Sequence, residues 1–204
     1  GLPFNKNFTP GHEYMGTVVA LGLGVDEYKI GQRVAVEIHA GCGQCKRCRE
    51  GMYTSCHNYG LNYGDVDKGH RVNGFTTDGG FCEYQVNHIN TLARIADDMP
   101  DEVGALVVTA GTAMYALTEL GGLVAGESVA VIGLGPIGLL VAAVAKALGA
   151  SPVIAVDIAD NRLEIARQLG ADHVVNVRNI DAVEAVHKLN GGKGVDYAVE
   201  CSAA

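Results

Sequence analysis

The chain has 204 residues, of which 48% are apolar and 19% are charged, and its formal net charge is -8. This composition is typical of a folded globular protein and excludes a disordered chain. The acidic balance argues against nucleic acid as a partner, because binding to a phosphate backbone needs clustered lysine and arginine. No apolar run reaches the roughly 18 residues of a membrane-spanning helix, and we expect no signal peptide and no membrane partner.

The hydrophobic pattern changes near residue 100, which predicts two domains, 1–100 and 101–204. In the first, short β-type runs alternate with glycine-rich turns, as in a strand-and-loop domain. These runs cover residues 16–22, 32–40 and 81–87. In the second domain, strand-type and helix-type runs alternate. Strands are predicted in 128–133, 152–157, 172–177 and 195–200, and helices in 136–148, 161–170 and 181–189. Repeated βα alternation predicts an α/β fold, a parallel sheet with helices on its faces.

His12 and Glu13 stand between a Pro-Gly turn and the first β-type run. An imidazole and a carboxylate at the edge of a strand can project into a cleft. Without other context, such a pair is more often surface decoration or a satisfied hydrogen bond. The pair alone therefore predicts no function.

Four of the six cysteines lie in residues 41–57: Cys42, Cys45, Cys48 and Cys56. The first three are separated by two residues each, so one short loop can bring four sulfur atoms to a common centre. This spacing predicts a structural zinc site, because four thiolates fill the tetrahedral coordination of zinc and leave no position for substrate. A disulfide framework or a redox site is the alternative. The basic residues between the thiols either offset the charge of the zinc centre or form a solvated loop.

A glycine-rich turn follows the first predicted strand of the second domain and begins its first predicted helix. The turn comprises Gly133, Leu134, Gly135, Pro136, Ile137 and Gly138. Its glycines have the G-x-G-x-x-G spacing of a dinucleotide-binding turn. In this motif the glycines allow a tight turn, the approach of a pyrophosphate to the backbone, and close packing of helix and strand. A tight βα turn without a ligand is the alternative.

Asp157 ends the next predicted strand, 19 residues after Gly138. Its carboxylate can accept hydrogen bonds from the hydroxyls of an adenine ribose and would repel a 2′-phosphate, so NAD is favoured over NADP. Arg162 follows in the first turn of the next helix, where it either contacts the nucleotide or is simply solvated. The glycine turn and Asp157 together predict a Rossmann-type cofactor site.

Taken in order, "GHEYMGTVVALGLGV", "GQRVAVE", "CGQCKRCREGMYTSC", "GGFCEYQV" and "GLGPIG" resemble the zinc-containing alcohol dehydrogenases of the medium-chain dehydrogenase/reductase family, the group that includes sorbitol and threonine dehydrogenases. The resemblance covers nearly the whole chain. It implies a β-rich GroES-like barrel domain with a structural zinc lobe, followed by a Rossmann doubly wound parallel sheet that binds NAD. It also implies a homo-oligomer, a dimer or a tetramer, when the protein is full length.

The same resemblance implies that His12 is a ligand of a catalytic zinc and that Glu13 lies near this metal or binds it. Zinc lowers the pKa of a bound hydroxyl group, so we expect hydride transfer between a secondary alcohol or polyol and NAD, with a carbonyl compound as the product. Cys42, Cys45, Cys48 and Cys56 would form the structural zinc lobe. Free thiolates suit a reducing compartment, so we expect the cytoplasm.

Two departures from the family pattern leave other functions open. A further catalytic ligand, usually a cysteine before the His-Glu pair, is expected outside this chain, and Thr109 stands where the family has a cysteine or an acidic residue. Cys82 is a replacement ligand or, more simply, a small buried strand residue. Cys201 and the other histidines (His39, His57, His70, His88, His173 and His187) are expected to be structural.

The second domain offers only about four strands of a sheet that usually has about six, so the chain resembles a middle piece of a longer enzyme. The alternatives are a zinc-independent medium-chain reductase and an inactive, zinc-stabilised nucleotide-binding fragment.

Overall fold

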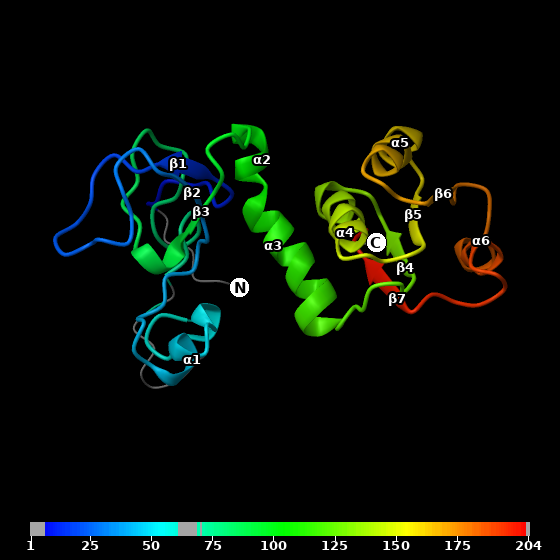
Figure 1. Ribbon diagram of the computed structural model, residues 1–204, viewed down its shortest axis with the longest axis horizontal. Coiled ribbons are helices and arrows are strands. Elements are labelled where there is room, and N and C mark those ends of the chain that lie inside the picture. Colours follow the sequence, from blue (N-terminus) through cyan, green and yellow to red (C-terminus); the bar gives the residue numbers. More distant parts are fainter. Residues whose placement is uncertain (1–6, 61–68, 70, 203–204) are drawn as a thin grey trace. The chain divides into compact units, whose positions relative to one another are not determined.

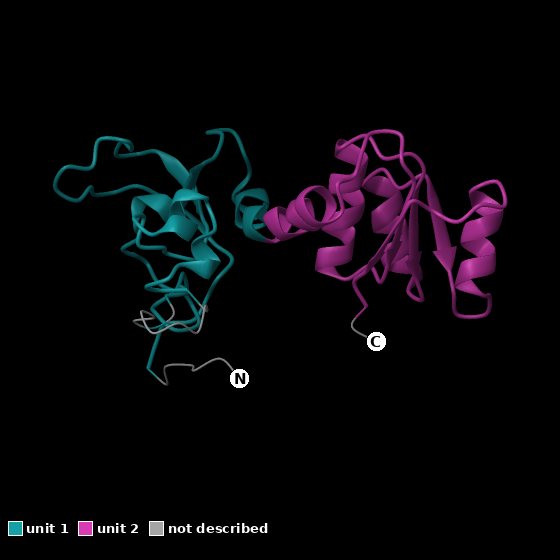
Figure 2. Ribbon diagram, turned by 90° about the horizontal axis from the view of Figure 1, so that it is seen from below, with its two compact units in different colours: residues 1–108 teal, residues 109–204 magenta. Residues whose placement is uncertain are grey.

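The computed structural model describes residues 7–60, 69 and 71–202. The chain divides into two compact units, residues 1–108 and 109–204 (Figure 2). The first unit extends beyond residue 100, and Arg33 binds the segment 96–101 near its end. Its guanidinium donates to the carbonyl oxygens of Ala96 and Met99 and pairs with Asp101. Among the described residues, none of the helices has the length and apolar character needed to cross a bilayer.

The first unit contains a three-stranded antiparallel sheet in the order β1-β2-β3 (Figure 1). The strands are β1 (Met15–Thr17), β2 (Arg33–Val36) and β3 (Leu92–Arg94). The central strand β2 is apolar except for Arg33, and Val34, Ala35 and Val36 are buried. The helices of this unit are short, as the glycine-rich sequence predicts. They are α1 (Lys46–Arg49), η1 (Tyr53–Ser55), η2 (Ile89–Thr91) and α2 (Asp101–Ala105).

Three predictions for this unit are wrong in detail. The run 32–40 forms a strand only over Arg33–Val36. The run 16–22 forms a strand only at its start, since beyond Val18 the chain leaves the sheet. The run 81–87 forms no strand, although it has the composition of one. A strand requires a partner for its backbone groups, and no described strand pairs with this run, so Phe81, Tyr84 and Val86 are largely exposed. In contrast, the short strand β3 is fixed by pairing with β2, which its sequence did not reveal.

The second unit confirms the predicted α/β pattern. Its four parallel strands lie in the order β6-β5-β4-β7 (Figure 1). The strands are β4 (Val129–Ile132), β5 (Val153–Asp157), β6 (His173–Asn176) and β7 (Tyr197–Glu200). The helices between them are α4 (Pro136–Ala147), α5 (Asp160–Gln168) and α6 (Ala182–Leu189). Each strand and helix predicted from the alternation is present.

The alternation of side chains along the strands places helices on both faces of the sheet. Val129 and Val131 point to one face and pack with residues of α4 and α5, whereas Ala130 points to the other and packs near α6. Val129 and Val131 are fully buried. Burial of a side chain of this size contributes about 2 kcal/mol to folding. The same core cluster also contains Val153 and Ala155 of β5, so the core on this face extends from β4 to β5.

The helical segment before β4 joins the same core. It consists of α3 (Val107–Tyr115) and the π-helical turn η3 (Ala116–Leu120). Ala113 and Leu117 are each 1% exposed and pack with the cluster that contains α4. The sequence pattern did not define these helices, because their mean apolar character is high on all sides.

The strand order creates a switch point beside the glycine turn. From β4 the chain moves to β5 and β6 on one side, and later returns to place β7 on the other side of β4. In open α/β sheets of this kind, ligands bind in the crevice outside the carboxyl ends of the strands at such a switch point. The turn that follows β4 therefore lies where a doubly wound fold binds its cofactor.

Candidate functional site

The four clustered cysteines meet as predicted. Their sulfur atoms all lie within 4.8 Å of one another, with 3.9 Å between Cys42 and Cys48 and 4.0 Å between Cys45 and Cys56. A tetrahedral zinc with Zn–S bonds of about 2.3 Å requires sulfur atoms about 3.8 Å apart. None of the four thiols is in a disulfide, which would need a separation of about 2 Å between the sulfur atoms. The geometry fits a four-thiolate metal centre and excludes the disulfide alternative.

Backbone N–H groups surround these sulfur atoms. The N–H groups of Cys42, Asn58 and Tyr59 point at the sulfur of Cys56, which is completely buried, at 3.3–3.4 Å. A hydrogen bond from the Asn58 side chain lowers the pKa of Cys42 to about 5, and burial raises the pKa of Cys48 to about 12. A metal bound at this centre would therefore displace protons, above all from the buried thiol of Cys48.

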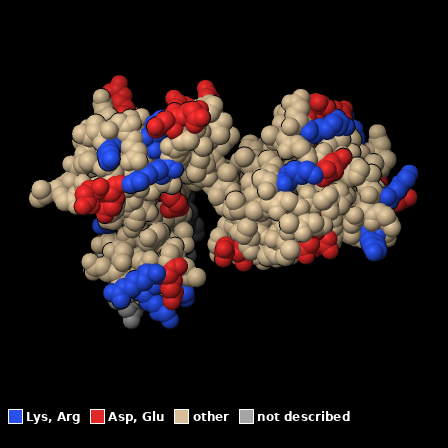
Figure 3. All heavy atoms as spheres, viewed as in Figure 1, with Lys and Arg blue, Asp and Glu red and all other residues tan. Residues whose placement is uncertain are grey.

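Basic side chains gather over α1, beside this centre (Figure 3). Lys46 and Arg47 lie 3.9 Å and 3.5 Å from the carboxylate of Glu50 in exposed ion pairs. Such pairs contribute little stability, because water screens them. The helix and its C-terminal neighbour Glu50 thus carry solvated charges of both signs.

His12 and Glu13 lie just before β1. The His12 Nε2 atom is 3.9 Å from a carboxylate oxygen of Glu13, and both side chains are about half exposed, at 44% and 49%. The His12 ring packs against the ring of Phe75, with 4.4 Å between the centroids. The pair therefore presents one nitrogen and one carboxylate donor at a partly open surface, which is a donor set that zinc accepts.

A glycine-lined contact fixes the backbone of this pair. The segment 9–11 runs beside 78–81, and the N–H of Gly79 donates to the carbonyl of Thr9 at 2.7 Å. A Cβ on Gly74 or on Gly79 would lie within 2.3 Å of the carbonyl oxygen of Gly11. Only glycine permits this approach. The glycine content of residues 72–81 marks a close backbone contact, but no motif in the sequence indicates that this segment supports His12.

A buried polar network continues below the pair. The Tyr14 hydroxyl donates to the amide oxygen of Asn87 at 3.0 Å and accepts from Asn73 at 3.1 Å. Burial raises the pKa of Tyr14. Asn73 and Asn87 also line a cavity of about 480 Å³ within the first unit. The side chain two positions after His12 is thus held rigidly, which limits the motion of the segment that carries the pair.

The remaining candidate ligands have structural surroundings. Thr109 is buried in α3, and Cys82 is exposed with its sulfur 3.3 Å from the carbonyl of Gly79, so its prediction as a buried strand residue is wrong. Within the described residues, the cysteine cluster is the one group of three or more metal-ligating side chains. His39, His88 and His187 accept or donate local hydrogen bonds. His70 lies outside the described residues.

The glycine turn has a different requirement at each glycine. Gly133 has φ of +85°, a conformation that favours glycine, and a Cβ there would also meet the backbone of Ser202 at 2.6 Å. A Cβ on Gly138 would lie 1.9 Å from the carbonyl oxygen of Gly133, so helix α4 can approach the strand only because this residue is glycine.

Gly135 is the exception, because no atom lies within 4 Å of the position its Cβ would take. Its backbone is extended, with φ of -66°, and it caps the N-terminus of α4. The fold therefore does not require glycine here. The empty space at the N-terminus of a 12-residue helix is where a pyrophosphate would approach the first N–H groups, so the turn fits a dinucleotide.

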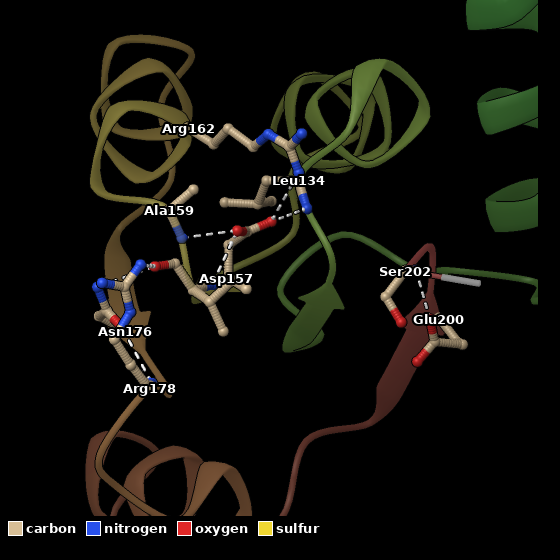
Figure 4. Close-up of polar contacts among 9 residues, drawn as sticks. Leu134, Asp157, Ala159, Arg162, Asn176, Arg178, Glu200 and Ser202 are labelled. Carbon is tan, nitrogen blue, oxygen red and sulfur yellow. Dashed lines mark hydrogen bonds and ion pairs between the residues drawn. The ribbon is translucent and has the colours of Figure 1, made fainter. Parts of the chain in front are cut away.

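Asp157 lies at the carboxyl end of β5 and faces this turn (Figure 4). Its Oδ2 atom accepts from the Leu134 N–H at 2.6 Å, and Oδ1 accepts from the N–H groups of Ile158 and Ala159 at 2.7 and 2.8 Å. Arg162 lies 3.8 Å from Oδ2. Burial favours the neutral carboxyl, but these three bonds and the Arg162 charge outweigh it, so the pKa of Asp157 is lowered. Asp157 is a fixed carboxylate beside the turn.

Two further features border this site and were not predicted. Ser202, after the carboxyl end of β7, packs against Gly133 from the other side of the switch point. Asn176 and Arg178, at the end of β6, bind the segment that follows Asp157 (Figure 4). Their sequence carries no motif. Their position at the carboxyl end of a neighbouring strand is the signal that could have identified them.

Comparison with known proteins agrees with both halves of this architecture. Residues 2–97 match the family described as alcohol dehydrogenase GroES-like domain, and residues 136–204 match the family described as zinc-binding dehydrogenase. Both units of this chain are therefore similar to the zinc-binding alcohol dehydrogenases. The predicted fold, a GroES-like domain followed by part of a Rossmann sheet, is thereby confirmed.

The curated relatives are longer than this chain. It is 40% identical over 194 residues to an L-threonine 3-dehydrogenase of Pyrococcus horikoshii and 35% identical over 198 residues to a sorbitol dehydrogenase of Bacillus subtilis. These matches cover 95% and 96% of the chain but 52% of each relative. The chain thus spans about half the length of these curated relatives.

A solved structure shows the same arrangement. A candidate zinc-binding dehydrogenase from Sinorhizobium meliloti, bound to NADP, superposes with a TM-score of 0.85 and 29% identity. The superposition covers 100% of this chain and 56% of the other. The dehydrogenase fold described above is therefore common to proteins whose sequences have diverged widely.

We expect Cys45→Ser to abolish zinc binding by residues 41–57 and to lower the melting temperature, because binding energy at such a centre is folding energy. Zinc content per chain and thermal unfolding measure the effect. Cys82→Ser is the matched control, since this cysteine is outside the cluster and exposed, and it should retain both zinc and stability. An unchanged zinc content in Cys45→Ser would contradict the assignment.

We expect Gly135→Ala to weaken cofactor binding and Gly138→Ala to lower stability. The first should fold with an unchanged melting temperature but bind NADH at least about tenfold more weakly, because its methyl group fills the space for the pyrophosphate. The second should lose on the order of 1–3 kcal/mol of stability through overpacking. Calorimetry of unfolding and of NADH binding distinguishes the two. A destabilised Gly135→Ala with normal NADH affinity would refute this interpretation.

The lowered pKa of Asp157 predicts an acid-dependent loss of stability. Since the pKa in the folded state is below the unfolded value of about 3.9, the contribution is fully present above that value and is lost as pH falls through the folded pKa. Asp157→Asn should remove this pH-dependent contribution, so that the loss of stability between neutral and acidic pH becomes smaller. Urea unfolding at pH 7 and pH 3 measures it, with Glu164→Gln on the exposed side of α5 as the control. Identical pH profiles for Asp157→Asn and the unmodified protein would contradict the prediction.

Proposed function

We propose that the full-length protein is a zinc- and NAD-dependent oxidoreductase that interconverts a secondary alcohol or polyol and its carbonyl compound. The observation that carries the proposal is the open space at Gly135 beside the fixed carboxylate of Asp157. The families that the chain matches supply the reaction class, and the two relatives described above act on a threonine hydroxyl and on a polyol according to their names.

The residues of the second unit would bind the dinucleotide. The N-terminus of α4, opened by Gly135, would receive the pyrophosphate through backbone N–H groups and the helix dipole. Asp157 would accept a hydrogen bond from the adenine ribose, and Arg162 would lie over the same part of the nucleotide. NAD supplies the acceptor for hydride when it is bound. The chain's own contribution is to hold that cofactor at the switch point of the sheet.

The charge of Asp157 supports NAD over NADP. Its carboxylate is ionised at neutral pH, and its position would bring it close to a 2′-phosphate of like charge. The Sinorhizobium meliloti structure contains NADP, so the fold itself does not exclude NADP. In this chain the choice between NAD and NADP depends on the Asp157 carboxylate and on two nearby arginines, Arg162 and Arg178.

His12 and Glu13 would hold a catalytic zinc together with ligands from elsewhere in the full-length protein. A bound zinc lowers the pKa of a hydroxyl group, and for water the change from about 15.7 to about 7 corresponds to on the order of 12 kcal/mol. His12 presents its Nε2 atom, Phe75 packs against the imidazole ring, and the glycine contact behind the segment holds the backbone. The same half-open surface leaves room for an alcohol beside the pair.

The cysteine cluster, the location and the oligomeric state concern the molecule as a whole. The cysteine cluster would hold a structural zinc that replaces a hydrophobic core in residues 41–57. Thiols that form no disulfide suit a reducing compartment, which supports the cytoplasm as the location. A homo-oligomer, a dimer or a tetramer, rests on the family resemblance alone.

One observation favours a second candidate, a zinc-independent medium-chain reductase. Thr109 is neutral and buried at the position where a cysteine or an acidic ligand is expected, and a threonine hydroxyl is a poor zinc ligand. Such a reductase would keep the glycine turn, Asp157 and the cysteine cluster. A zinc-stabilised nucleotide-binding module without activity is a third candidate, for which the 204-residue chain alone would suffice.

We expect the full-length protein to contain about two zinc ions per chain and to oxidise secondary alcohols with NAD. His12→Ala should reduce the zinc content to about one and lower kcat/KM at least about a thousandfold, which corresponds to about 4 kcal/mol, while NADH affinity is unchanged. His39→Ala is the matched control, because His39 also pairs with a glutamate, Glu37, and should keep both properties.

One zinc per chain in an active unmodified protein would support the reductase instead, and NADH binding without any turnover would support the module. Full activity in His12→Ala would refute the catalytic zinc.

A further inference from the structure

The orientation of the Asp157 carboxylate depends on the short segment that follows it. Two of its three N–H donors come from Ile158 and Ala159, which connect β5 to α5. An ionised carboxylate has about four acceptor positions, two on each oxygen. Oδ1 uses both of its positions on these donors, whereas Oδ2 receives one N–H bond, from Leu134. The Arg162 guanidinium lies 3.8 Å from Oδ2, beyond hydrogen-bond distance, so one acceptor position remains for a ribose hydroxyl, and its direction depends on the conformation of the segment 158–160.

Two side chains from the end of β6 hold this segment from outside (Figure 4). The Asn176 amide donates to the carboxylate of Asp160 at 2.6 Å and to the Ile158 carbonyl at 3.4 Å. The Arg178 guanidinium donates to the same carbonyl at 3.1 Å. The backbone N–H of Arg178 donates to the side-chain amide oxygen of Asn176 at 3.0 Å, so the two residues form one connected network.

These bonds add to what the sheet already provides. Asn176 lies opposite Asp157 in the parallel ladder, and the N–H of Val177 donates to the Asp157 carbonyl at 3.1 Å. The ladder therefore secures the backbone of β5 up to Asp157 but not the segment beyond it. The side chains of Asn176 and Arg178 act on that segment alone, on the carbonyl of the residue whose N–H binds Asp157.

We propose that Asn176 and Arg178 are positioning residues for cofactor selectivity: by holding the segment 158–160, they keep the Asp157 carboxylate in the orientation that accepts a ribose hydroxyl and opposes a 2′-phosphate. This inference rests on the proposed function, since it assumes a nicotinamide dinucleotide at the glycine turn. It assigns part of the preference for NAD to residues on the neighbouring strand that do not themselves contact the ribose.

The test is the affinity of the full-length protein for NADH and for NADPH, measured by titration calorimetry. Asn176→Ala removes no charge, so its effect on the two cofactors is not confounded by a change in the local electrostatic potential. We expect the Kd for NADH to rise about tenfold, which corresponds to the loss of one hydrogen bond from the ribose hydroxyl to the Asp157 carboxylate. The Kd for NADPH should change less than about threefold. The ratio of the two affinities should fall accordingly.

Two comparisons separate positioning from a purely structural role. Lys146→Met breaks the ion pair with Asp172, which lies immediately before β6 at its opposite end, and should lower stability without changing the NADH-to-NADPH ratio. In an Asp157→Ser background, Asn176→Ala should leave the Kd for NADH unchanged, because the group it positions is gone. Arg178→Lys retains a donor and should preserve most of the preference for NADH.

The outcomes are distinguishable from a failure of the proposed function. If the unmodified protein does not bind NADH, the proposed function fails and the inference fails with it. If it binds NADH and Asn176→Ala weakens both cofactors equally, or weakens NADH equally in the Asp157→Ser background, the positioning role is overturned and the proposed function stands.

Discussion

The hydrogen bond from the Leu134 N–H to the Asp157 carboxylate joins the two parts of the cofactor site. It connects the glycine turn after β4 to the end of β5, and it is possible because Gly133 and Gly138 let strand, turn and helix approach within distances that no side chain would permit. An unpaired buried carboxylate would be strongly unfavourable, so the three N–H donors around Asp157 are a condition for placing a charge there. The remaining features of the site, including the contacts from β6, are arranged around that charge.

The first unit is stabilised differently, because it has few long helices or strands from which to build a core. Its sheet has three short strands, and close backbone contacts between glycines connect the segments 9–11 and 72–81. In residues 41–57 the cysteine cluster takes the place of buried apolar side chains. A rigid frame built without long helices or strands would suit a half-exposed pair such as His12 and Glu13 if it held a metal, since metal ligands must keep their geometry while one side remains open.

The two units also differ in how far their structure follows from local sequence. In the second unit, each strand and helix predicted from the βα alternation is present, because apolar periodicity and parallel-sheet burial act on the same residues. In the first unit, the run 81–87 has a strand-like sequence but forms no strand, and β3 forms where no clear pattern exists. Strand formation there depends on a partner that lies far away in the sequence, which a local pattern does not contain.

By itself, the sequence determined the four-cysteine centre, the glycine turn and the carboxylate at the end of the next strand, because each requires particular residue types at fixed spacing. The tertiary structure decided what surrounds them. It showed that the fold tolerates a side chain at Gly135 but not at Gly138, that segment 72–81 supports His12, and that Asn176 and Arg178 reach the segment after Asp157. These relations arise from contacts between residues distant in the chain, and spacing along a sequence carries no record of which distant groups the folded backbone brings within bonding distance.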